Sequence, residues 1–346
     1  MRRDYSLTGA ASEHAKATGL ASAQWYQTDI PRKTMKQLMK RSDGPGLRDT
    51  ALWLALLFTF AIATWLSWGS LWAAPCLFIY ALLYGTASDS RWHECSHGTA
   101  FKTPWINNAV YYLASFMVIR EPKVWKWSHA RHHTDTIIVG RDQEIMGHRP
   151  TRIARHLLGL LGIPQTYNTF KSLTRHALGR LSADEQDFIP EMEQPAVFKT
   201  ARLMLLGYGL TTGLSVYFQS WFIACIIGVL PAMMGVWLAY LFGLTQHAGL
   251  AENVLDHRKN CRTILMGPVF RFLYWNMNYH TEHHMYPMVP YHQLPALHAL
   301  MKDDCPAPYT STWQALKEVA SAMWAQRQDP NFYIDRTLPD PKPLDA

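Results

Sequence analysis

Residues 51–88 read ALWLALLFTFAIATWLSWGSLWAAPCLFIYALLYGTAS and contain no Asp, Glu, Lys or Arg. A transmembrane helix needs about 20 consecutive apolar residues to cross roughly 30 Å of hydrocarbon. This stretch is long enough for two such helices, with a turn at Gly69 and Ser70. We therefore predict two spans, at about 50–69 and 71–88, joined as a hairpin. The alternative is a single long buried helix.

A second uncharged stretch covers residues 203–251. It is also long enough for two helices. We predict spans at about 201–219 and 221–246, with a turn near Gln219 and Ser220. The chain is thus expected to be an all-α integral membrane protein with four transmembrane helices in two hairpins.

Composition supports a membrane protein over a soluble enzyme. Hydrophobic residues make up 49% of the 346 residues and charged residues only 17%. The net charge of +7 comes from basic residues spread along the chain without a nucleic-acid-binding motif, so no nucleic-acid partner is expected. A further apolar segment, about 106–119, is too short to cross the bilayer and is predicted to be an interfacial helix.

The placement of basic residues predicts the orientation. The two hairpin turns are uncharged, whereas Lys and Arg are frequent before the first span, between the hairpins and after the last span. Cytosolic segments of membrane proteins are enriched in Lys and Arg. Both termini and the central region are therefore expected in the cytosol, with a cytosolic helical cap over the spans. The protein is expected in a membrane, and a bacterial inner membrane is the favoured location.

Three regions follow from this topology. They are a cytosolic N-terminal segment at 1–48, a membrane domain at 49–300 and a cytosolic C-terminal tail at 301–346. In the tail, apolar residues recur at helical spacing from Trp313 to Trp324, which predicts an amphipathic helix.

Half of the 16 histidines fall into three short motifs. Each motif follows an apolar segment: HECSH at 93–97, HARHH at 129–133 and HTEHH at 280–284. On a helix, residues three or four positions apart share one face, so each motif can direct its imidazoles together. One HxxxH motif is weak support for a metal site, but two HxxHH motifs and an HxxxH in this arrangement are strong support.

Neutral imidazole binds iron, copper, zinc or nickel. The eight candidate ligands are too many for one metal ion, so we predict a site with two metals. They are His93, His97, His129, His132, His133, His280, His283 and His284. His247, at the cytosolic end of the fourth predicted span, is a ninth candidate. The remaining histidines, which include His156, His257 and His298, are expected to be non-ligands.

At these motifs the chain resembles the membrane fatty-acid desaturase/hydroxylase superfamily over roughly residues 50–300. The resemblance implies that the motifs bind two iron ions that activate O2, and that His247 joins them. Some relatives have an Asn where this chain has Gly243, so a water-mediated contact from that position is not expected. The segments Asp256-His257-Arg258 and Met285-Tyr286-Pro287 are similar to a bacterial subgroup that includes rhizobitoxine-type desaturases and hydrocarbon oxygenases.

The expected reaction is desaturation of a fatty acyl or amphiphilic substrate. The alternatives are a di-iron hydroxylase acting on an alkyl or terpenoid substrate and, less favoured, a histidine-rich metal transporter. No flavin or dinucleotide motif is recognisable, so electrons are expected from a ferredoxin-like or other carrier docking on the basic cytosolic face. No catalytic residue is predicted beyond the metal ligands. Four carboxylates are expected to orient ligand imidazoles: Glu94, Asp135, Asp142 and Glu282.

Overall fold

The computed structural model describes residues 3–339, and every regular element in that range is helical. Its only strand-like features are two isolated bridges, Thr263 with Tyr279 and Ile264 with Tyr309. The predicted all-α class is confirmed. The helices are α1 (Ala10–Ala17), α2 (Arg32–Leu38), α3 (Asp43–Leu66), α4 (Ala73–Ser96), α5 (Pro104–Met117), α6 (Pro122–Thr134), α7 (Ile153–Leu160), α8 (Ile163–Ala177), α9 (Ala183–Phe188), α10 (Gln194–Tyr217), α11 (Trp221–Ile226), α12 (Val229–His247), α13 (His257–Asn260), α14 (Pro268–Tyr274), α15 (His280–Met285), α16 (Leu294–Met301) and α17 (Thr312–Gln328), with 3-10 turns η1 (Glu191–Glu193) and η2 (Tyr291–Gln293).

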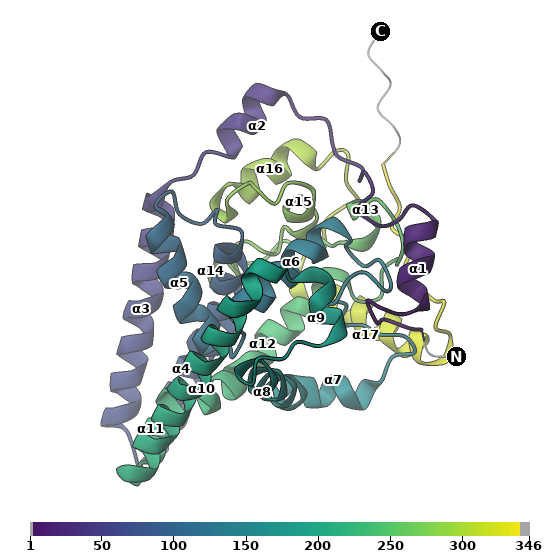
Figure 1. Cartoon of the computed structure of the whole chain (residues 1–346). Coiled ribbons are helices and arrows are strands. Elements are labelled where there is room, and N and C mark those ends of the chain that lie inside the picture. The colour runs from purple at the N-terminus through teal and green to yellow at the C-terminus, as the bar shows by residue number, and fades with distance from the viewer. Residues whose placement is uncertain (1–2, 340–346) are drawn as a thin grey trace.

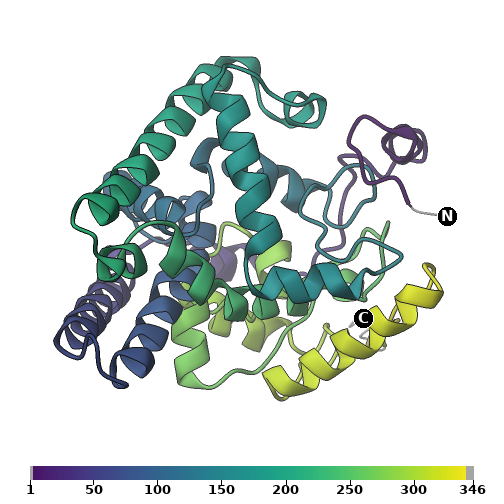
Figure 2. The same cartoon turned by 90° about the horizontal axis from the view of Figure 1, so that it is seen from below.

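Long and short helices occupy different parts of the molecule. In Figure 1 the long helices α3, α4, α10 and α12 run through the lower part, and α6, α15 and α16 lie towards the upper end. Helix α4 is central, because it packs against α3, α5, α12 and α14. Figure 2 shows α17 at an edge of the molecule, away from the hairpin of α3 and α4.

Helices α4 and α12 cross closely at two glycines. A Cβ atom on Gly235 would lie 1.7 Å from the carbonyl oxygen of Ala81, and one on Gly85 would lie 2.6 Å from the backbone of Gly235. No larger residue fits without a shift of the backbone. The Thr86 hydroxyl also donates to the Gly235 carbonyl at 2.7 Å. The crossing fixes how the ends of these helices, which carry His93 and His247, lie relative to each other.

Two segments are long and apolar enough to cross a membrane by length and composition. They are Arg32–Leu66, with 35 residues, and Trp221–His247, with 27 residues. These contain the first and fourth predicted spans. The second and third predicted spans lie in α4 and α10, which do not pass the same test. In both, polar and small residues interrupt the apolar sequence.

Two further segments that were predicted to be helical are helices in the structure. The segment predicted at about 106–119 is α5, and the apolar repeat of the tail lies on α17. The last residues of the predicted tail, 340–346, with Pro341 and Pro343, lie outside the described residues.

Candidate metal centre

The structure brings all nine predicted ligand histidines together in two groups. Within each group the ring nitrogens that could bind a metal lie within 4.8 Å of one another. The first group is His93, His97, His129, His133 and His283, and the second is His132, His247, His280 and His284.

Both HxxHH motifs contribute to both groups. In every motif the two histidines four residues apart stay in one group, as expected for a pair on one helix face. The remaining histidine of each HxxHH motif crosses over, so that His132 joins the second group and His283 joins the first. Each of α6 and α15 therefore links the two groups.

The first group holds imidazole nitrogens at close range. The Nε2 atom of His129 lies 3.0 Å from Nε2 of His97 and 3.2 Å from Nε2 of His133. Nε2 of His133 lies 3.1 Å from that of His283. Because Nδ1 of His129 faces the Glu144 carboxylate at 3.0 Å, that nitrogen carries the proton. The Nε2 atom of His129 thus presents a lone pair to its neighbours.

The second group shows the same pattern around His280. Its Nε2 atom lies 2.9 Å from Nε2 of His247 and 3.0 Å from Nε2 of His284. Nδ1 of His247 donates to the carbonyl oxygen of Asn260 at 2.8 Å, so Nε2 of His247 has no proton when the ring is neutral.

The tautomer of His284 is fixed in a similar way. Its Nδ1 atom lies 3.1 Å from the Thr136 hydroxyl, whose own proton goes to the His132 carbonyl at 2.6 Å. Nδ1 of His284 must therefore be the donor, and its Nε2 atom also presents a lone pair. His280 can donate to only one of its two neighbours, so this arrangement leaves unprotonated nitrogens facing one another.

These separations fit a shared cation. Two nitrogens that each bind a metal at about 2.0–2.1 Å, at right angles, lie about 3.0 Å apart. The Nε2 separations of 2.9–3.2 Å match this value. A cation between the rings would turn the repulsion between lone pairs into coordination.

Burial favours the neutral, metal-binding form of seven of the nine imidazoles. Desolvation and neighbouring imidazoles lower the pKa values of His133, His283 and His284 well below the ordinary value. His132 differs: burial lowers its pKa, but the Asp142 carboxylate outweighs this effect and raises it.

The two groups are in direct contact. The ring of His133, in the first group, stacks on the ring of His284, in the second, with centroids 4.3 Å apart and an interplanar angle of 24°. The arrangement can therefore hold two neighbouring cations.

Two carboxylates from one loop hold ligand imidazoles. Asp142, as predicted, faces Nδ1 of His132 at 2.8 Å. Glu144 was not predicted, although it lies only two residues further along, and it faces Nδ1 of His129. Burial would raise the pKa of Glu144, but His129 and the Ser128 hydroxyl lower it to about 2, so its carboxylate is charged.

Glu94 lies between imidazoles from two motifs. Its Oε1 atom is 3.5 Å from Nδ1 of His283 and 3.7 Å from Nδ1 of His93. Neither carboxylate oxygen has a hydrogen-bond partner among the described residues. Burial raises the pKa of Glu94 to about 8. Cations bound to these imidazoles would favour the charged carboxylate.

The other two predicted carboxylates make their contacts elsewhere. Asp135 pairs with Arg141 at 3.0 Å and accepts the Ser22 backbone N–H at 2.9 Å. Glu282 accepts from the Thr263 hydroxyl at 2.6 Å and from Nδ1 of His298 at 2.5 Å. Through these contacts Asp135 and Glu282 stabilise the segments that carry the ligand candidates.

His257 lies closer to the centre than its isolated place in the sequence suggested. It is 2% exposed, and its ring centroid lies 5.2 Å from that of His284. With Cys261 and His284 it forms a third set of potential donors. The spacing of four residues between His257, on α13, and Cys261 is the sequence feature that could have identified His257 as a potential donor.

A cavity of about 430 Å³ opens onto the histidines. Ligand candidates from both groups line it, among them His93 and His132. Apolar side chains such as Ile119, Met233 and Val236 also line it.

Polar side chains also line the cavity. Arg155, Gln165, Asn168 and Tyr240 also line a second pocket, of about 350 Å³, which contains none of the ligand candidates. The guanidinium group of Arg155 has no ion pair among residues 3–339. Arg155 is exposed, so a solvated cation without an ion pair in this range lies on the same cavity as the histidines.

Comparison with known proteins identifies a family and a relative of this chain. The family described as "Fatty acid desaturase" matches residues 67–315, a segment that contains all nine histidines. The chain is also similar to the Delta(5) fatty acid desaturase fat-4 of Caenorhabditis elegans, with 23% identity over 290 residues. That match covers 75% of this chain and 64% of the nematode protein, which is thus less than two thirds of its length.

Proposed function

Since the chain belongs to the fatty acid desaturase family, we propose that it is a membrane-bound non-haem di-iron desaturase of an aliphatic substrate. In the balanced reaction, one O2, two electrons and two protons convert a –CH2–CH2– unit into –CH=CH– and two water molecules. The observation that carries this proposal is the pair of adjacent imidazole groups facing one cavity.

The chain's own residues would prepare the site. The five histidines of the first group would hold one iron and the four of the second group the other. When bound, the two irons would supply the activation of O2 that allows an unactivated C–H bond to be broken. Asp142 and Glu144 would fix the orientation and tautomer of His132 and His129.

The cavity would orient the substrate. Its apolar lining residues, such as Met233 and Val236, suit an alkyl chain, and its polar lining residues suit a charged or polar head. Arg155 could pair with a carboxylate or phosphate there. We therefore infer an amphiphilic substrate with an anionic head, which the family's lipid chemistry accommodates.

A four-span topology is supported by exposed side chains. Leu203, Leu206, Leu210 and Leu214 of α10 are each 49–59% exposed, and they form a stripe at helical spacing. In water such a stripe would be a large apolar patch, whereas in a bilayer it would face lipid. We infer that α10 crosses the membrane with α3, α4 and the α11–α12 pair.

Aromatic residues support a membrane interface at the hairpin tips. Trp65 and Trp68, next to the first turn, lie edge-on to Phe222 of α11, with ring centroids 5.0 and 5.3 Å apart. Trp72 and Trp221, one beside each turn, are 75% and 74% exposed. Trp is enriched where membrane proteins meet the interface. The hairpin tips would then lie on the side of the membrane opposite to the histidines and both termini.

The test is product analysis after co-expression with a ferredoxin and its reductase. Extracted lipids and amphiphiles should contain O2-dependent products two hydrogens lighter than their precursors. The matched control is His132→Ala, which should give no product.

Other products would separate the alternatives. Products heavier by one oxygen atom would replace the desaturase with a hydroxylase. An iron-loaded protein with neither product in any lipid fraction would contradict the proposal.

A further inference from the structure

Trp25 lies over the metal centre although it is outside the segment matched by the family. Its side chain is half-buried. The indole Nε1–H donates to the carbonyl oxygen of Thr134 at 2.9 Å. Thr134 directly follows His133, a member of the first group. Trp25 is therefore one hydrogen bond and one residue away from that group.

The same indole also leads to the second group. It stacks on His257 with ring centroids 4.2 Å apart and an interplanar angle of 3°. The buried His257 ring in turn lies next to that of His284, with centroids 5.2 Å apart. A continuous series of rings runs from a partly exposed Trp to a ligand candidate.

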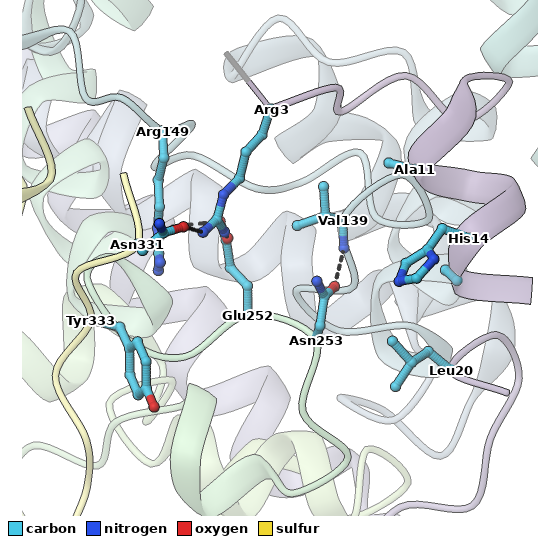
Figure 3. A pocket seen from close by; sticks show the side chains of 11 residues that line it. Arg3, Ala11, His14, Leu20, Val139, Arg149, Glu252, Asn253, Asn331 and Tyr333 are labelled. Atoms are coloured by element: carbon cyan, nitrogen blue, oxygen red, sulfur yellow. Dashed lines mark hydrogen bonds and ion pairs between the residues drawn. The ribbon is translucent and has the colours of Figure 1, made fainter. Parts of the chain in front are cut away.

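The segment that carries Trp25 is fixed on its N-terminal side. Figure 3 shows Arg3 and Arg149 converging on Glu252, with which both form ion pairs. The Tyr5 hydroxyl also donates to Glu252 at 2.9 Å and accepts the Arg149 backbone N–H at 3.0 Å. Residues from the start of the chain are thus tied to two distant loops.

The C-terminal side of the segment is fixed as well. The hydroxyl groups of Tyr26 and Thr28 donate to the Asp304 carboxylate at 2.8 and 2.6 Å. Tyr26 N–H donates to the Leu255 carbonyl at 3.0 Å, and the Arg258 guanidinium lies 3.5 Å from the centre of its ring. Trp25 is therefore held in place between two anchored stretches.

We propose that Trp25 is the point of electron entry, where a one-electron carrier protein makes contact and passes electrons to the metal centre. The proposal rests on the proposed function. Each transfer oxidises the carrier by one electron and reduces the centre by one, and two transfers supply the two electrons of a turnover. Electron transfer weakens steeply with distance, so closely packed conjugated rings between the surface and the ligands favour it.

A purely structural role for Trp25 would be to cover His257. Varying the source of electrons distinguishes this covering role from a role in electron entry. A small reductant such as dithionite does not need a docking point, whereas a carrier protein does. If Trp25 only covers the site, its loss should affect both sources of electrons alike.

The experiment uses iron-loaded full-length protein and follows reduction of the oxidised centre by stopped-flow spectroscopy. Reduced [2Fe–2S] ferredoxin and dithionite are compared for Trp25→Leu, Trp25→Phe and the control Trp313→Leu. Trp313 is 69% exposed on α17. Iron content is measured for each protein, so that loss of metal is recognised separately.

In Trp25→Leu, reduction by ferredoxin should slow by about tenfold or more, a rise of at least about 1.4 kcal/mol in the activation free energy. Reduction by dithionite and iron content should stay at the wild-type level. Trp25→Phe, which keeps a ring on His257, should retain most of the ferredoxin rate, and Trp313→Leu all of it.

An unchanged ferredoxin rate in Trp25→Leu would overturn the proposal. Equal slowing with both reductants would also overturn it and would assign Trp25 a covering role. Neither result would affect the proposed desaturase function. Conversely, a wild-type protein that binds no iron would remove the proposed function itself.

Discussion

Oδ2 of Asp142 lies 2.8 Å from Nδ1 of His132, and the same oxygen accepts the Ile137 backbone N–H at 2.8 Å. The other carboxylate oxygen accepts the N–H of Glu144 at 2.7 Å, and Glu144 holds His129. One loop therefore positions an imidazole in each of the two groups. The orientation of both groups depends on the conformation of this loop.

Asp142→Asn should weaken the centre without unfolding the protein. The amide can still accept from His132, but it removes the negative charge that makes the imidazole a better ligand. We expect a loss of about 10–100-fold in metal affinity or turnover. Titration against a competing chelator measures the affinity. Asp303→Asn is the matched control, because Asp303 is exposed and lies outside both histidine groups. Equal affinities in the two variants would count against the role of Asp142.

His247→Ala should lose both iron and activity. Its Nε2 atom lies 2.9 Å from that of His280, so its removal would open a coordination position. The measurements are iron content and turnover of the purified variant. His14→Ala is the control, because His14 is exposed and belongs to neither group. Survival of both iron and activity in His247→Ala would restrict the site to the eight histidines of the motifs.

The other ligand candidates give a broader test of the same site. Ala at His97, His132 or His283 should abolish turnover, whereas His156→Ala should not. The His156 ring contacts the Tyr240 hydroxyl at 2.8 Å and belongs to neither group.

The sequence was most informative where ligands are repeated at helical spacing. The three motifs and the position of His247 at the end of an uncharged run were enough to choose the nine histidines of the two groups, but not His257 of the third set. The all-α class was equally accessible, because the uncharged stretches are too long and too apolar for any other class.

The division into groups of five and four could not be predicted. It depends on how α4 and α12 cross at Gly85 and Gly235, and on how α6 and α15 face each other. For the same reason, the sequence did not predict contacts between segments that lie far apart in the chain. Trp25 and His257, for example, stack on each other but are 232 positions apart in the sequence, and no local sequence pattern links them.

Arg155→Gln should raise KM while leaving kcat almost unchanged. Arg155 lines both the cavity and the second pocket, which contains none of the ligand candidates, so it should contribute to binding and not to the chemical step. Loss of a charge-assisted contact of about 1.5–3 kcal/mol corresponds to a rise in KM of roughly 10–150-fold.

Steady-state kinetics with an anionic and a neutral-headed analogue would measure this effect. The rise in KM should be seen only with the anionic analogue. Arg180→Gln is the control, because this exposed arginine lines neither pocket. A lower kcat with unchanged KM would contradict the assignment.

Tags at Ser70 and Ser220 should report the membrane side opposite to tags at either terminus. Both residues lie in the uncharged turns between long helices, whereas basic residues flank the other ends. Accessibility of the tags in intact and permeabilised cells measures this. A signal from the 120–155 region on the same side as Ser70 would contradict the four-span topology.

Metal analysis of the detergent-purified protein, combined with Mössbauer spectroscopy, tests the central claim most directly. The two imidazole groups should hold close to two iron equivalents per chain, because five and four ligands are shared between two adjacent positions. The same preparation of His247→Ala should contain less iron. One zinc equivalent per chain with no iron would contradict the account.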